Sequence, residues 1–133
     1  STHDDLTALV DRMRQMARAL LPEGQVQFVV PDALPTLPLP MNVRRHLYLF
    51  YKEALHNAAR HAEAEQVTVE LTVTGRQLTL RVKDDGTGFD PATVEAGRGF
   101  QTLERRAQAL DGTYDLVSEP GRGTRVELVL NIA

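Results

Sequence analysis

The chain has 133 residues, of which 42% are hydrophobic and 25% charged, a size and balance that predict one soluble globular domain with its own core. It contains no cysteine, which excludes a disulfide framework and a thiolate metal site. Its net charge of −3 gives no general attraction to nucleic acid, and no apolar run is long enough to span a membrane. We therefore expect a cytoplasmic protein without a nucleic-acid partner.

The first half of the chain predicts two helices separated by a strand. Apolar residues recur at helical spacing over residues 4–21. A strand is predicted at 25–30, and the prolines between 31 and 40 predict an extended connector. A long helix is expected over residues 41–62.

The second half is richer in strands. Alternating apolar and polar residues predict four of them, at 66–74, 77–83, 114–117 and 124–130. Gly75-Arg76 has the composition of a hairpin turn. A polar, glycine-containing segment is expected to continue to Gly99, and a helix to run from Phe100 to Leu110.

The predicted helix at 41–62 carries a polar stripe. Glu53, Asn57 and His61 are four residues apart and project from one face, with Arg60 beside them. The opposite face is apolar and is expected in the core, through Leu47, Phe50, Ala54, Leu55 and Ala58. Oxygen ligands and cationic donors on one stripe suit a metal-bound polyphosphate. The stripe alone does not define a site.

Three glycine-bearing turns follow, and each has a plain alternative as a turn, a linker or a hairpin loop. Asp84 ends a predicted strand, so its carboxylate can accept the amino hydrogen of adenine, and Gly86 and Gly88 let backbone approach a flat base. Gly97-Arg98-Gly99 precedes a predicted helix, whose N-terminal amides suit phosphate. Gly121-Arg122-Gly123-Thr124 offers a cation and a hydroxyl to the same ligand.

The order of these motifs resembles the family of gyrase, heat-shock chaperone, histidine kinase and mismatch-repair ATPases, known as the GHKL or Bergerat fold. Within it, the chain is similar to the catalytic ATP-binding domain of bacterial sensor histidine kinases of the type paired with NarL-like response regulators. The resemblance covers about residues 25–132. Its motifs are an N box at 53–62 and glycine boxes at 84–89, 97–107 and 121–124.

Carried to matching positions, the resemblance implies that Asn57 is a Mg²⁺ ligand and that Glu53 orients or activates a water. The residues assigned to ATP besides Asn57 are Arg60, His61, Asp84, Gly86, Gly88, Gly97, Arg98, Gly99 and Thr124. Among these residues, Asp84 binds adenine. Residues 90–98 form a lid over the ligand. The implied cofactors are ATP and Mg²⁺. One departure is Thr102, where many relatives carry glycine.

The resemblance and the predicted elements together imply an α+β sandwich. It has a mixed, mostly antiparallel sheet of about five strands with about three helices on one face, plus an N-terminal helix. Residues 1–22 look like the C-terminal remnant of a dimerisation helix with its linker, and residues 23–133 like the catalytic domain. His3 has no helical hairpin around it and is expected to be incidental.

The implied reaction donates the γ-phosphate of ATP to a histidine on a dimerisation domain absent from this chain, for relay to a response regulator. The chain alone is expected to be a monomer, and the parent kinase a homodimer that a membrane anchor could hold. Two alternatives stay open. One is a serine kinase of the same fold that acts on an anti-sigma-factor antagonist, and the other is a degenerate nucleotide-sensing or interaction module.

Overall fold

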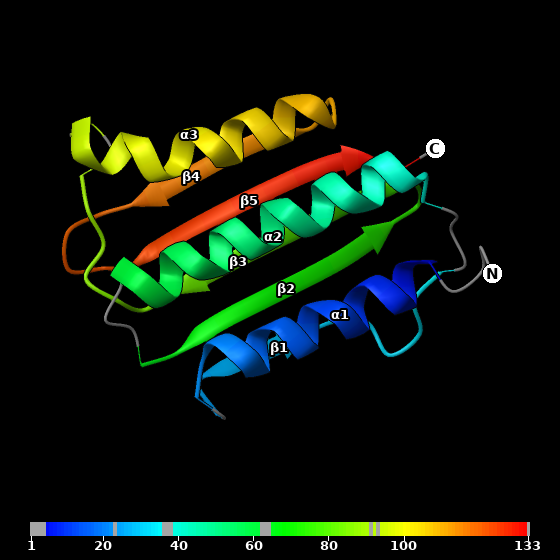
Figure 1. Cartoon of the computed structure of the whole chain (residues 1–133), viewed down its shortest axis with the longest axis horizontal. Coiled ribbons are helices and arrows are strands. Elements are labelled where there is room, and N and C mark those ends of the chain that lie inside the picture. Colours follow the sequence, from blue (N-terminus) through cyan, green and yellow to red (C-terminus); the bar gives the residue numbers. More distant parts are fainter. Residues whose placement is uncertain are drawn as a thin grey trace.

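The computed structural model describes residues 5–22, 24–35, 39–61, 65–90, 92 and 94–132, with the backbone alone for residues 5, 60–61 and 94–99. Within these residues, three helices cover one face of a five-stranded sheet (Figure 1). The helices are α1 (Asp5–Leu20), α2 (Met41–His61) and α3 (Val94–Ala109). The strands are β1 (Val26–Val29), β2 (Val67–Thr74), β3 (Gln77–Asp84), β4 (Thr113–Ser118) and β5 (Thr124–Asn131).

The sheet has the strand order β1-β2-β3-β5-β4. β1 is parallel to β2, and the other neighbours are antiparallel. The hairpin between β2 and β3 turns at Gly75, whose φ of 61° lies in the left-handed region that glycine adopts without strain. The mixed, mostly antiparallel sheet expected from the sequence is confirmed.

The core lies between the sheet and the helices. Alternate residues of each central strand point toward the helices, as Val69 of β2, Leu80 of β3 and Leu128 of β5 do, and all three have 0% exposure. The apolar face predicted for α2 is buried at all five positions: Leu47, Phe50, Ala54, Leu55 and Ala58. None of the described helices is both long enough and apolar enough to cross a membrane.

The N-terminal helix α1 packs into this same core. Leu9 and Met13 are buried, and the hydroxyl of Tyr51 on α2 donates a hydrogen bond of 2.6 Å to the Met13 carbonyl oxygen. α1 is therefore one of the three described helices on the sheet, not an addition to them, and its side chains share one hydrophobic cluster with residues beyond position 23. His3 lies outside the described residues.

Helix α3 begins at Val94, six residues before the expected start at Phe100. The prediction of an irregular segment as far as Gly99 was wrong for residues 94–99. This segment contains Gly97 and Gly99, but glycine inside a helix costs only about 1 kcal/mol relative to alanine. Tertiary packing of α3 against α2, with Leu103 and Ala107 buried, is available to offset that cost.

Candidate functional site

Three polar side chains are buried in the described part of the chain: Asn57, Asp84 and Ser118. Two of them lie in register at one end of the sheet, because Asp84 and Ser118 both pair with Thr124 at the start of β5. The C-terminal half of α2, which carries Asn57, lies over this end (Figure 1). Burying polar groups costs free energy unless they find partners, so their gathering here marks the candidate site.

Asp84 is the last residue of β3 and is 6% exposed. Its Oδ1 accepts a hydrogen bond of 2.9 Å from the Gly86 amide. Burial raises the pKa of this carboxyl, although hydrogen bonds from the Gly86 and Thr124 amides act in the opposite direction. A buried carboxylate with acceptor capacity to spare is suited to a ligand that brings a hydrogen-bond donor, such as the amino group of adenine.

The neighbouring Asp85 holds the backbone in place. It is exposed, and its Oδ1 accepts hydrogen bonds from the amides of Glu65, at 2.9 Å, and Gln66, at 3.0 Å. These bonds hold the residues that lead into β2 against the end of β3. Of the two adjacent aspartates, Asp84 thus faces the buried site, and Asp85 joins the end of β3 to the residues before β2.

Two of the glycines allow the loops at this end to touch. A Cβ on Gly88 would lie 2.0 Å from the Glu119 carbonyl oxygen, and a Cβ on Gly123 would lie 2.1 Å from that of Asp84. Both glycines also have positive φ, of 65° and 80°. Room for a flat base was the expected reason for Gly88; the structure supplies another, which is close contact with the loop after β4.

Ser118 joins the two loops through hydrogen bonds that the sequence analysis missed. Its Oγ accepts from the Phe89 amide at 2.9 Å, donates to the Gly123 carbonyl at 3.2 Å and lies 2.9 Å from Thr124 Oγ1. One donated and two accepted bonds use the full capacity of a hydroxyl when Thr124 is the donor. The available signal was a serine that directly follows the strand predicted at 114–117 and precedes the Gly-x-Gly-Thr loop.

The stripe on α2 divides between buried and accessible positions. Asn57 is 5% exposed, whereas Glu53, one turn earlier, is partly exposed and lines a hollow between α2 and α3. Arg60 and His61 lie in the last turn of α2, and their side chains are outside the described part. Glu53 and Asn57 therefore lie one turn apart on α2, and their roles toward a ligand remain predictions.

The start of α3 lies beside the first glycine loop. The rings of Phe89 and Phe100 stack with centroids 4.8 Å apart, which joins the loop after β3 to α3. Gly97, Arg98 and Gly99 belong to the first turns of the helix, so the amides without helical acceptors are those at the true start, near Val94. The predicted lid at 90–98 is thus partly helical in this structure.

This arrangement defines an ATP-binding α+β domain, in which a helix stripe and a strand-end carboxylate flank paired glycine loops. Residues 42–133 match the family described as histidine kinase-, DNA gyrase B-, and HSP90-like ATPase, and the chain belongs to this family. The resemblance drawn from the four motifs is confirmed, and ATP is the ligand of the family.

The relatives are sensor kinases. The chain is 37% identical to the sensor histidine kinase LiaS of Bacillus subtilis over 130 residues, which is 97% of this chain and 34% of that protein. It is 35% identical to the sensor protein VraS of Staphylococcus saprophyticus over 107 residues, which is 80% of this chain and 31% of that protein. The chain therefore spans about a third of the length of these relatives.

A solved structure agrees with the sequence relatives. The ATP binding domain of PrrB from Mycobacterium tuberculosis superposes with a TM-score of 0.74 at 26% identity, covering 97% of this chain and 95% of that one. Of the possibilities that the sequence left open, these likenesses favour the histidine kinase over the serine kinase and the interaction module.

Proposed function

We propose that this chain is the catalytic, ATP-binding domain of a sensor histidine kinase. In the intact protein, the γ-phosphate would pass from ATP to a histidine on a dimerisation domain outside this chain, and then to a response regulator. The observation that carries the proposal is the burial of Asn57 and Asp84 at one end of the sheet. The 37% identity to a sensor histidine kinase over 97% of the chain supports it.

The adenine end would be formed by Asp84 and the residues that hold it. Asp84 would accept the exocyclic amino hydrogen of adenine, while Thr124 and Ser118, in register beside it, keep the strand ends together. A hydrogen bond to a charged acceptor contributes about 1.5–3 kcal/mol, roughly ten- to a hundredfold in affinity. Guanine presents an acceptor at the same position, so this contact would select ATP over GTP.

The phosphate end would be formed by the stripe on α2 and the start of α3. The described residues hold no group of three or more His, Cys, Asp or Glu side chains that could bind an ion. A single protein ligand, the Asn57 carboxamide, fits Mg²⁺, because this ion keeps several waters and shares phosphate oxygens. When bound, the ion neutralises charge on the phosphates. Glu53 would orient a water, and Arg60, His61 and Arg98 would reach the phosphates.

The proposal also assigns partners and a place in the cell. The partners are the dimerisation and phospho-acceptor domain of the parent kinase and a response regulator. The parent would be a homodimer, and this part of it would lie in the cytoplasm. Residues 1–22 would connect the domain to the dimerising helices. Because α1 packs on α2 through Tyr51 and Met13, that connection would run directly onto the helix that carries the N box.

Titration calorimetry with a non-hydrolysable ATP analogue tests the site. We expect binding that strengthens with Mg²⁺ and exceeds binding of the matching GTP analogue. Mixing the chain with ATP and a purified histidine-bearing dimerisation domain should then produce acid-labile phosphohistidine. Absence of nucleotide binding with and without Mg²⁺ would refute the site, and binding without transfer to any histidine-bearing domain would refute the kinase assignment.

A further inference from the structure

Two adjoining hollows lie between α2 and α3, and both are lined by Thr102 and Arg106. The first has a volume of about 260 Å³ and is also lined by His46, Arg105 and Ala109. The second, of about 400 Å³, extends toward Glu53 and is lined by Lys52, His56 and Leu49 as well. We call the two together the interhelical groove. Its His46 end lies about 16 Å along α2 from Asn57, at 1.5 Å per residue.

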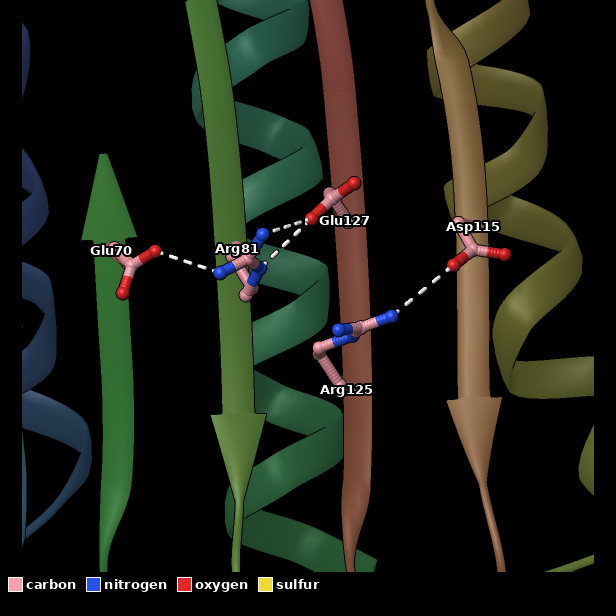
Figure 2. Close-up of polar contacts among 5 residues, drawn as sticks. All are labelled: Glu70, Arg81, Asp115, Arg125 and Glu127. Atoms are coloured by element: carbon pink, nitrogen blue, oxygen red, sulfur yellow. Dashed lines mark hydrogen bonds and ion pairs between the residues drawn. The ribbon is translucent and has the colours of Figure 1, made fainter. Parts of the chain in front are cut away.

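Several basic side chains elsewhere in the described structure have partners. On the face of the sheet that the helices leave open, Arg81 bonds to both Glu70 and Glu127, and Arg125 pairs with Asp115 at 3.4 Å (Figure 2). The hydrogen bond to Glu127, with the charges of Glu127 and Glu70, raises the pKa of Arg81. Carboxylates therefore neutralise Arg81 and Arg125 on this face.

Two basic side chains of α1 are also engaged. The guanidinium of Arg12 lies 4.4 Å from the centre of the Tyr48 ring, and that of Arg14 lies 4.9 Å from the centre of the Phe28 ring. Both contacts are of the cation–π type. These arginines secure α1 on α2 and β1.

In the groove, three cations without neutralising partners among the described residues line adjoining hollows. Lys52, Arg105 and Arg106 make no hydrogen bond, ion pair or ring contact with any residue that the structure describes. Among the described residues that line the two hollows, Glu53 is the one carboxylate. Like charges held close together repel, and a bound anion would relieve that repulsion.

We propose that the His46 end of the interhelical groove binds a small, multiply charged, phosphate-bearing anion at a site separate from the nucleotide. Arg105 and Arg106 on α3 would bond to the phosphate oxygens through their planar forks, and Lys52 would add a flexible cation from α2. The small size of the hollow favours a free anion over a polypeptide.

His46 completes this site from α2. Its Nδ1 is buried and has no hydrogen-bond partner in the described structure. Nε2 would be the ring nitrogen that contacts the bound anion. The site thus takes donors from both helices, with Arg106 lining both hollows between His46 and Lys52.

Titration of inorganic pyrophosphate without Mg²⁺, followed by calorimetry, tests this inference. We expect binding that weakens as NaCl is added, because the contacts are electrostatic. Arg106→Gln and Arg105→Gln should each reduce the affinity about tenfold, as the loss of a charge-assisted hydrogen bond predicts. Arg76→Gln, which removes the same charge from the exposed β2–β3 turn, is the matched control and should bind as the wild type does. Circular dichroism verifies that each variant is folded.

A second titration separates this site from the nucleotide site. With a non-hydrolysable ATP analogue at saturation, binding of pyrophosphate that depends on Arg106 should persist. Complete displacement by the analogue would overturn the inference, because the groove would then be the phosphate end of the nucleotide site. Failure of pyrophosphate to bind, or equal binding by Arg106→Gln, would also overturn it. If the analogue does not bind at all, the nucleotide proposal fails while the Arg106 comparison still decides this one.

Discussion

Replacing Asp84 by asparagine should separate nucleotide recognition from stability. Asparagine has nearly the same shape and keeps an oxygen to accept the Gly86 amide, so the loop after β3 should keep its course. The variant loses the charged acceptor for adenine, worth about 1.5–3 kcal/mol, so its affinity for an ATP analogue should fall roughly ten- to a hundredfold. Its amide group can donate to guanine, so the preference for the ATP analogue over the GTP analogue should narrow or reverse.

The stability of Asp84→Asn should increase relative to the wild type, and the size of the increase should depend on pH. Burial raises the pKa of Asp84 in the folded state, so the protonated carboxyl stabilises the fold at low pH and this contribution is lost as pH rises through the folded pKa. Asparagine does not ionise. The Tm of Asp84→Asn relative to the wild type should therefore increase from acid to neutral pH.

Asp85→Asn is the matched control, because it removes the same charge from the adjacent, exposed position. It should leave the affinity for the ATP analogue near that of the wild type. The reasoning is refuted if Asp84→Asn binds the ATP analogue as the wild type does, if Asp85→Asn loses affinity equally, or if the Tm difference for Asp84→Asn shrinks as pH rises.

Three further variants test the loops and the packing of α1. Ser118→Ala leaves the part-buried Phe89 amide without its acceptor, so we expect a loss of about 1–3 kcal/mol in urea unfolding and weaker nucleotide binding; full stability would contradict the bonding scheme. Gly123→Ala should impair both properties, since its Cβ would meet Asp84, whereas Gly121→Ala has open space and should carry only backbone strain of about 1–3 kcal/mol. Tyr51→Phe should cost about 1 kcal/mol in stability and leave nucleotide affinity unchanged; unaltered stability would show that the bond to Met13 contributes nothing.

Much of the fold could be predicted because its signals are local. The five apolar positions of α2 recur at helical spacing, and all five are buried. Alternation within β2 and β3 located the strands to within a residue or two, and Gly75-Arg76 located the turn between them. The order of the four motifs was sufficient to recognise the family, because each motif is a short run of specific residues.

The site was predicted in part. Asp84 and Asn57 were identified by residue type and position, at a strand end and on a helix stripe, and both proved to be buried. The role of Ser118 was missed, since the hydrogen bond from Phe89 joins residues 29 positions apart. The start of α3 was misplaced because local rules weigh glycine against helix without knowing what the helix packs on.

The sequence by itself determined the identity of the elements, the buried face of each and the family. Tertiary structure alone decided that α1 joins the common core, that Gly88 lies against Glu119 and that Ser118 links two loops. It also decided which arginines are neutralised and which line the interhelical groove without partners in the described structure. The physical reason is that propensity and periodicity act over a few residues, whereas close approach and charge pairing depend on residues that only the folded chain brings together.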